Sequence, residues 1–331
     1  MASGQYYMGR NPSRTIHVKH LRNLHKLHEK KPINQFLCYI CESFILFMEN
    51  KSSFMDFVGL QYRGLDNAGD YIQSIATERL MPPVIERHDR DMLKIASPES
   101  LSCVIMNGWF SHDPGNCLPI SPNIIPVFWG FHITDWNKSW EYFLKDETLS
   151  YLKKHEPIGC RDPFTAYKLK ENGIETFVSR CLTLTLPSRK EQAAKKYIFI
   201  VDGEQLKIPE HIKKEAISFT HHISAHHSEQ TRWLYSKHLL YQYAANAKLV
   251  ITSRLHCALP CIAMGIPVVF FGSKDDYRVS WVSELGIPIN GVDEENVDWN
   301  PEPVLFEDKK NSMINDFKSF LSQKLNITAY E

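Results

Sequence analysis

Residues 249–269 read LVITSRLHCALPCIAMGIPVV. The pattern predicts an apolar strand over 248–252, a helix over 255–264 that Gly265-Ile-Pro terminates, and a second strand over 267–271. A strand, a helix and another strand in this order form a βαβ unit with parallel strands. The stretch therefore predicts an α/β fold.

The same alternation continues on both sides of this unit. Strands are predicted at 54–60, 102–106, 124–128, 157–160, 175–178, 197–201 and 217–220, and helices at 71–80, 139–154, 162–171, 231–246 and 308–325. The charged segment 188–196 is the best linker. We therefore predict a domain at 54–187 and another at 188–331. They form two Rossmann-like halves that face each other across a ligand cleft at the carboxyl ends of their strands.

Composition limits the classes of partner. The chain has 331 residues, with 38 Lys and Arg against 38 Asp and Glu, so it lacks the basic field that nucleic-acid binding needs. Any anionic ligand must be small and bound locally. The eight cysteines are scattered and lie mostly in apolar runs, which favours a reducing, cytoplasmic location over a disulfide framework.

The segment 1–53 differs from the rest of the chain. Its first 31 residues hold seven Lys or Arg and one acid, and the apolar run 36–48 is too short for a span of ~20 residues. We interpret 1–53 as a basic N-terminal extension that catalysis does not need. A solvated arm before a core helix, an extension upstream of a start at Met48, and a peripheral membrane contact remain open. Cys38 and Cys41 lack a second ligand pair, so no metal is expected there.

Polar residues gather where the first quoted strand turns into its helix. Ser253, Arg254 and His256 occupy that turn, where free backbone N–H groups and the positive end of the helix dipole favour an oxyanion or phosphate. The plainer alternative is that Arg254 pairs with a local acid and His256 is a half-buried structural histidine. An arginine and a histidine at one strand-to-helix turn favour a functional site.

A second arginine occupies an equivalent turn in the first half. Arg161 follows the extended segment 157–160, and Asp162 is predicted to cap the next helix. Arg161 alone is equally compatible with a surface ion pair. Two arginines at equivalent turns of facing halves could clamp one small dianion.

Two further loops are candidate binding segments. Asn67, Gly69 and Asp70 belong to a glycine-containing turn after the first strand, although the turn lacks the GxGxxG spacing of a dinucleotide site, and Asp70 is alternatively only a helix cap. Asn107 and Trp109 end another strand, and an aromatic ring on such a loop can stack on a sugar face, although Trp is more often part of the core.

Metal binding is not predicted at the histidine cluster of the second half. No carboxylate is interleaved among its members, and neither a Walker loop nor a HExxH motif is visible. The cluster comprises His221, His222, His226 and His227.

Four motifs in order resemble those of the polysaccharide pyruvyl transferases. They are NAGDYIQ at 67–73, IGCRD at 158–162, CLTLTL at 181–186 and SRLH at 253–256. The resemblance spans about 55–271. It implies two Rossmann-like halves similar to the B-type glycosyltransferase fold. It also implies that Arg254, Leu255, His256 and Arg161 form a phosphoenolpyruvate site.

The implied reaction moves the enolpyruvyl unit of phosphoenolpyruvate to two hydroxyls of one sugar, which gives a pyruvate ketal and phosphate. The donor would be a substrate, and no cofactor is expected. The acceptor would be a saccharide of exopolysaccharide or polysaccharide biosynthesis, with a lipid-linked form left open. Ketal formation needs one acid and one base, and histidine suits that role near pH 7. The alternatives are a nucleotide-sugar glycosyltransferase of the same fold and a non-catalytic saccharide-binding relative.

Overall fold

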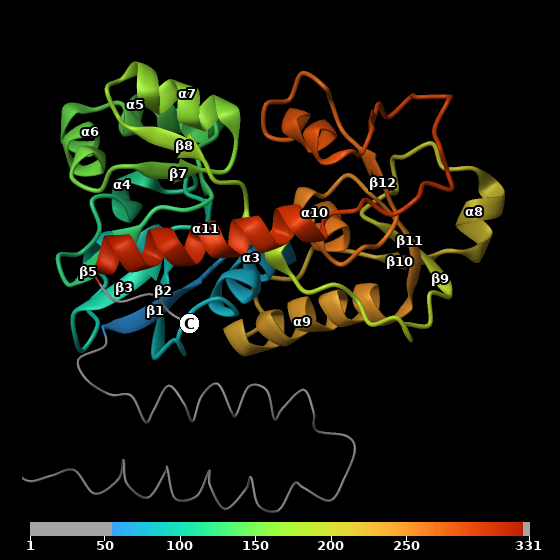
Figure 1. Ribbon diagram of the computed structural model, residues 1–331, viewed down its shortest axis with the longest axis horizontal. Coiled ribbons are helices and arrows are strands. Elements are labelled where there is room, and N and C mark those ends of the chain that lie inside the picture. Colours follow the sequence, from blue (N-terminus) through green and yellow to red (C-terminus); the bar gives the residue numbers. More distant parts are fainter. Residues whose placement is uncertain (1–54, 327–331) are drawn as a thin grey trace, which may run out of the picture. The chain divides into compact units, whose positions relative to one another are not determined.

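All the strands of the computed structural model, which describes residues 55–326, pair in parallel within their sheets (Figure 1). The mixed α/β class with parallel sheets is thus confirmed. In this part of the chain, no helix is long and apolar enough to cross a membrane.

The first half builds two four-stranded sheets rather than the single sheet expected. One has the order β2 (Glu86–Asp89), β1 (Asp56–Gln61), β3 (Ser102–Ile105), β5 (Ile124–Val127), and the other β4 (Gly108–Trp109), β6 (Phe131–His132), β7 (Ile158–Cys160), β8 (Thr176–Val178). Each of β3 and β5 is followed within a few residues by a strand of the second sheet. Hydrogen bonds from Met106 N to Val127 O and from Gly108 N to Gly130 O link the two sheets across this bend.

The second half has one five-stranded sheet. Its order is β10 (Ile217–Phe219), β9 (Tyr197–Val201), β11 (Ala247–Thr252), β12 (Val268–Phe271), β13 (Ile289–Asn290). The chain order therefore reverses between β9 and β11. Ligands of open α/β sheets bind beside such a reversal, outside the carboxyl ends of the strands.

Helices cover these sheets, and most expected helices are confirmed with shifted ends. They are α3 (Ala68–Glu78), α4 (Pro114–Cys117), α5 (Ser139–Phe143), α6 (Asp146–Lys153), α7 (Pro163–Glu171), α8 (Glu210–Glu215), α9 (Glu229–Asn246), α10 (Leu255–Ala263) and α11 (Glu307–Leu325). The helix expected over 139–154 is broken into α5 and α6 at Leu144 and Lys145, whose backbones leave the helical conformation.

Helix α3 joins the cores of the two halves. Its Ala68 and Ile72 belong to the apolar cluster of α9, α10 and the second sheet, whereas Tyr71 belongs to a cluster of the first half. The Tyr71 hydroxyl donates to Glu229 of α9 at 2.7 Å, and Arg232 of α9 donates to the backbone carbonyl of Leu65 at 2.6 Å.

Helix α11 returns from the second half to the first (Figure 1). Near its start, Lys310 donates to the carbonyl of Ala263 at 2.9 Å. Further along, Phe317 and Phe320 pack in a cluster with Phe57 of β1. The described residues thus belong to one compact unit. The boundary between 187 and 188 stays a prediction, and the expected extension 1–53 lies outside the described residues.

Candidate functional site

A pocket of about 290 Å³ lies at the carboxyl ends of the second sheet and against the loops of the first half. It is beside the reversal between β9 and β11, where the topology favours a ligand. We call it the arginine pocket. It is lined by Asn67, Gly69, Arg161, His221, Ser253, Arg254, Leu255, His256, Phe271, Gly272, Ser273, Asp276, Arg278 and Val279.

The turn from β11 into α10 forms one wall. Buried Thr252 ends the strand, and its hydroxyl accepts from the backbone N–H of Arg254 at 2.9 Å and donates to the carbonyl of Val201 at 3.1 Å. Arg254 is the N-cap residue of α10, and its side chain accepts no hydrogen bond from the helix. The first backbone N–H groups of α10 are therefore not capped by a side chain. Ser253 and Leu255 line the pocket at the same turn, as expected.

Arg254 is held by neighbours that orient its guanidinium. Its Nε donates to Asp202 Oδ2 at 2.7 Å, and its Nη2 lies against His222 Nε2. Burial opposes ionisation of Asp202, but hydrogen bonds from Thr220 and from the His221 backbone, together with Arg254, hold its pKa below the usual value. The local-acid alternative for Arg254 is therefore realised, while the residue also lines the pocket.

Arg161 is a buried cation without an ion-pair partner. The residue is 4% exposed, its Nε is buried without a hydrogen bond, and no carboxylate among residues 55–326 forms a salt bridge with it. Burial lowers the pKa of the guanidinium. An unpaired buried charge is costly, so the site gains free energy when an anion enters.

His256 presents a free ring nitrogen beside these arginines. The residue is half-buried, and its Nε2 is buried without a hydrogen-bond partner among the described residues. Burial, followed by the charge of Arg161 and the nearby His221, lowers the pKa of His256 well below its usual value. The imidazole is therefore neutral at pH 7 while the pocket holds no anion.

Asn67 and Gly69 bring α3 against this turn. The Asn67 side chain caps α3 by accepting from the backbone N–H of Gly69 at 3.1 Å. A Cβ at Gly69 would lie 3.2 Å from the Cβ of His256, so glycine permits the close approach. The backbone N–H of Ala68 donates to the carbonyl of His221 at 2.7 Å, which joins the two halves beside the pocket.

The structure does not bring the other three expected residues into the pocket lining. Asp70 is buried and lies 3.6 Å from Arg90 Nη1. The Asn107 side chain donates to Thr77 at 2.8 Å and accepts from the Leu182 backbone. These contacts give Asp70 and Asn107 supporting positions behind the site, because their polar atoms are engaged within the protein.

Trp109 is half-buried and does not line the arginine pocket. Its Nε1 donates to Thr134 at 2.8 Å, and its ring lies edge-on to exposed Trp136 at a centroid distance of 6.5 Å. The guanidinium of Arg90 lies 5.3 Å from the Trp109 ring centroid.

Asp162 caps α7 as expected, because its side chain accepts a hydrogen bond from the backbone N–H of Thr165 at 2.8 Å.

Arg278 is a pocket residue that the sequence reasoning missed. Its Nε and Nη2 both donate to the carboxylate of Asp276, in the loop that follows β12. The same loop touches the first half, because the Tyr277 hydroxyl accepts from Asp135 N at 3.2 Å and its ring lies 4.2 Å from that of Phe164. A polar loop after a buried strand was the available signal.

His132 is a second residue that the sequence reasoning missed. It is fully buried on β6, and its Nδ1 lies 2.6 Å from Asp162 Oδ2. Its Nε2 has no partner among the described residues, and burial followed by the Arg161 charge lowers its pKa to about 4. No local pattern marks it, because a long-range contact with Asp162 creates its environment.

The histidine cluster divides between different roles. His221 lines the arginine pocket, and His222 contacts Arg254 and lies 3.6 Å from Asp66, whereas His226 and His227 are exposed. Across 55–326, no group of three or more His, Cys, Asp or Glu side chains is arranged to hold a metal ion.

The fold and the pocket define an α/β protein with an arginine-rich site beside parallel strand ends. A family model described as polysaccharide pyruvyl transferase matches residues 67–275, more than half of the chain. The chain therefore belongs to the polysaccharide pyruvyl transferase family. Membership implies a transferase of polysaccharide biosynthesis and a polysaccharide acceptor. Arg278 lies just beyond the matched residues.

Among the chains of solved structures that match this one, one is covered almost completely. It is a crystal structure of a functionally uncharacterized protein from Klebsiella pneumoniae subsp. pneumoniae NTUH-K2044, with 14% identity and a TM-score of 0.43. The similarity covers 79% of this chain and 98% of that one. No curated protein matched the chain.

Proposed function

We propose that this protein transfers the enolpyruvyl unit of phosphoenolpyruvate to a saccharide and forms a pyruvate ketal. The observation that carries the proposal is the buried, unpaired guanidinium of Arg161 in one pocket with Arg254 and Arg278. Phosphoenolpyruvate bears a phosphate and a carboxylate, which match several planar guanidinium groups. The N–H groups at the start of α10, near Ser253 and Leu255, suit the phosphate.

The proposed arrangement is similar to the B-type glycosyltransferase fold, with the two halves facing each other. Two observations support it. Both halves carry parallel strands, and the pocket is lined from both, with Arg161 following β7 and Arg254 following β11. We assign the donor to the arginine pocket. We assign the acceptor to the side of the pocket that the first half forms, where Asn67 and Gly69 lie, whereas Asp70, Asn107 and Trp109 are not part of this assignment.

His256 is proposed as the general acid. Its proton would pass to the methylene carbon of the donor, which leaves an oxocarbenium-like centre at the adjacent carbon. One sugar hydroxyl bonds to that centre, the bond from carbon to the phosphate oxygen breaks, and the second hydroxyl closes the ketal. The two sugar hydroxyls each lose a proton. One of these protons replaces the proton that His256 gave to the new methyl group, and the other leaves with phosphate. A bound anion would raise the pKa of His256 and load its proton.

The competing functions make different demands on the pocket. A nucleotide-sugar transferase needs a face for the base and an acid for the ribose. Apart from its histidines, the described lining offers one aromatic residue, buried Phe271, and its carboxylate, Asp276, is engaged by Arg278. A non-catalytic relative would not need the combination of Arg161 and Arg254 with a histidine placed for proton transfer, His256, in one pocket. Phosphoenolpyruvate remains a substrate in this proposal, and no cofactor is invoked. A cytoplasmic location with a lipid-linked acceptor and peripheral membrane contact is likewise proposed, because such an acceptor would reside at a membrane surface.

Ligand-dependent thermal stability tests the donor. Phosphoenolpyruvate should raise the Tm of the full chain, and Arg161→Met should abolish that increase, because binding to the folded state alone stabilises it. UDP-galactose and GDP-mannose should leave Tm unchanged. A larger increase with either nucleotide sugar, retained in Arg161→Met, would favour the glycosyltransferase function instead.

A further inference from the structure

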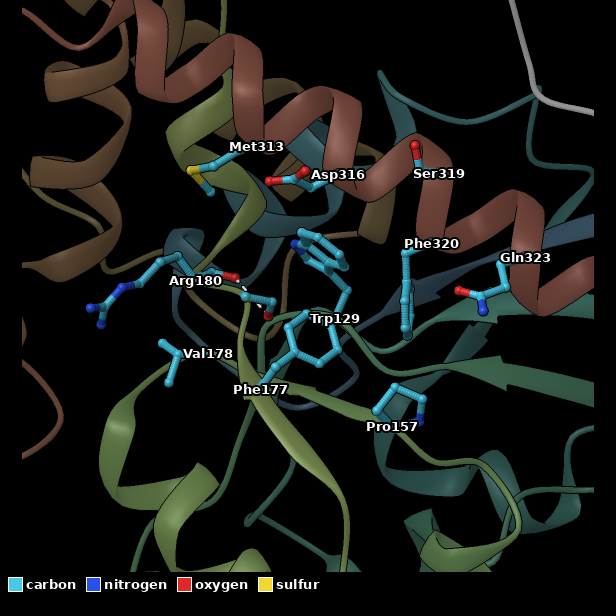
Figure 2. Close-up of a pocket in the computed structure, with 11 residues that line it drawn as sticks. Trp129, Pro157, Phe177, Val178, Arg180, Met313, Asp316, Ser319, Phe320 and Gln323 are labelled. Atoms are coloured by element: carbon cyan, nitrogen blue, oxygen red, sulfur yellow. Dashed lines mark hydrogen bonds between the residues drawn. The ribbon is translucent and has the colours of Figure 1, made fainter.

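A second pocket, of about 490 Å³, lies between α11 and the segment around β8 (Figure 2). We call it the α11 pocket. It shares no lining residue with the arginine pocket. Its lining consists of Trp129, Pro157, Phe177, Val178, Ser179, Arg180, Met313, Asp316, Ser319, Phe320 and Gln323.

Aromatic rings form the inner wall of the α11 pocket. The centroid of Trp129 lies 5.5 Å from those of both Phe177 and Phe320, and the two phenylalanine rings are 5.2 Å apart (Figure 2). Such a wall suits a ligand with an apolar, ring-shaped face, because aromatic surfaces bury area at well-defined geometry.

Polar side chains of α11 form the opposite rim. Asp316, Ser319 and Gln323 are spaced by three and four residues, so they share one face of the helix. They offer a carboxylate, a hydroxyl and an amide above the aromatic wall (Figure 2). Together these groups can both donate and accept hydrogen bonds, as a ligand with several hydroxyls requires.

Two residues that line this pocket have a buried donor without a partner among residues 55–326, Nε1 of Trp129 and Nη1 of Arg180. Trp129 is 3% exposed, and its Nε1 is buried without a hydrogen bond among the described residues. A buried N–H left unpaired is costly, so a bound group that accepts from it would be favoured.

The charges at the rim favour a neutral ligand. The Arg180 guanidinium is engaged by Glu284 and lies 4.7 Å from the ring centroid of Trp281. Its charge is therefore compensated, while the carboxylate of Asp316 would repel an anion. The α11 pocket thus differs from the arginine pocket, where Arg161 forms no salt bridge with a described carboxylate.

We propose that the α11 pocket binds a neutral saccharide unit of the acceptor polymer. A pyranose combines apolar C–H faces with hydroxyl groups, which matches an aromatic wall with a polar rim. The inference rests on the proposed function in one respect, namely that the bound sugar belongs to the acceptor polymer. Such a site would hold the polymer while another unit reacts, and would raise the effective concentration of acceptor.

Fluorine NMR of the full chain, labelled with 5-fluorotryptophan, tests this site without any donor. The signal of Trp129, one of seven tryptophans, is assigned by its loss in Trp129→Phe and by its shift in Ser319→Phe. Galactose, mannose and N-acetylmannosamine are the probes. At least one should shift the Trp129 signal in a saturable manner, and phosphoenolpyruvate should not displace it.

Variants on α11 separate this pocket from other sugar contacts. Ser319→Phe fills the pocket and should abolish the saturable shift, and Asp316→Ala should weaken binding about tenfold through loss of a charged hydrogen-bond partner. Asn315→Ala, exposed on the same helix and outside the lining, should bind as the unchanged protein does. No shift with any of the three sugars, or equal binding in Ser319→Phe, would overturn the inference. Because no donor is present, failure of the pyruvyl transfer itself would leave this result unaffected.

Discussion

The Nε of Arg254 lies 2.7 Å from the Oδ2 of Asp202, so this arginine lines the pocket while it forms an ion pair with a carboxylate of the protein. Arg278 is held in a similar way by Asp276. Arg161, which lies in the same pocket, has no such partner among the described residues. Two arginines are thus oriented by carboxylates, and the third forms no salt bridge with a described carboxylate, although Asp162 and Asp70 favour its charge from a greater distance.

Arg161→Met should remove donor binding without destabilising the fold. Methionine fills much of the same space and needs no counter-charge, and replacing a costly buried ion by an apolar side chain is often neutral or stabilising by 1–4 kcal/mol, taken as an order of magnitude. Urea unfolding should therefore show an unchanged or increased free energy of unfolding. The response of Tm to phosphoenolpyruvate should be lost.

Arg90→Met is the matched control for that variant. Arg90 is also fully buried, but it donates to Asp91 at 2.9 Å and lies 3.6 Å from Asp70. Its removal leaves carboxylates without their cation and should destabilise the protein by about 3–5 kcal/mol. Equal destabilisation in the two variants would show that Arg161 has a structural partner and is not free for an anion.

Arg254→Lys should not restore activity. A lysine ammonium cannot contact Asp202, His222 and a ligand oxygen in one plane, as the guanidinium can. The expected loss of transition-state binding is on the order of 2–4 kcal/mol, measured as kcat/KM for phosphoenolpyruvate. Near-normal kcat/KM would remove Arg254 from the site.

His256→Ala and His256→Gln distinguish proton transfer from anion binding. As general acid, His256 contributes ~10²–10⁴-fold, so both variants should lose about that factor in kcat while they still bind phosphoenolpyruvate. Glutamine keeps a hydrogen-bond donor but cannot transfer its proton. Recovery of much of the rate in His256→Gln, with weaker donor binding in His256→Ala, would show a purely electrostatic role.

Stability should rise as pH increases from about 4 to 6.5, because burial lowers the pKa of His132 from 6.5 to about 4 in the folded protein. Within this range the unfolded chain binds a proton at His132 and the folded protein does not, so acid favours unfolding. Above pH 6.5 His132 is neutral in both the folded and the unfolded protein. The free energy of unfolding is therefore higher there than below pH 4, by on the order of 3 kcal/mol from this histidine. His256 acts in the same direction, since its pKa is also lowered.

Urea unfolding at several pH values measures this slope. His132→Asn should reduce the slope between pH 4 and 6.5, whereas His238→Asn, at an exposed position on α9, should leave it unchanged. An unaltered slope in His132→Asn would mean that His132 does not remain neutral in the folded protein.

The regular elements were predictable because their signals are local. Apolar runs predicted β9 and β11, and Gly265 with its positive φ of 68° ends α10 where the sequence indicated. The division of the first half into two sheets was not predicted. It arises because the chain bends between β3 and β4, so that β3 pairs in one sheet and β4 pairs with β6 in the other.

The pocket residues that were predicted either follow a strand directly or stand at the start of the next helix, as Asn67, Gly69, Leu255 and His256 do. Arg161, Ser253 and Arg254 reach the pocket in the first of these ways. Asp202 follows β9 in the same manner but was missed, although a carboxylate at a strand end was a usable signal. His132 gains its environment through a contact thirty residues away in sequence, which no local pattern reports.

Phosphate release from phosphoenolpyruvate is the most direct test of the proposed reaction. The full chain should be assayed with galactose, mannose and N-acetylmannosamine acceptors, alone and in short oligosaccharides, with His256→Ala and Arg161→Met beside it. Release should depend on an acceptor and should fall at least about a hundredfold in His256→Ala. Release that is equal without acceptor, or no release with any of these acceptors, would contradict the proposed reaction.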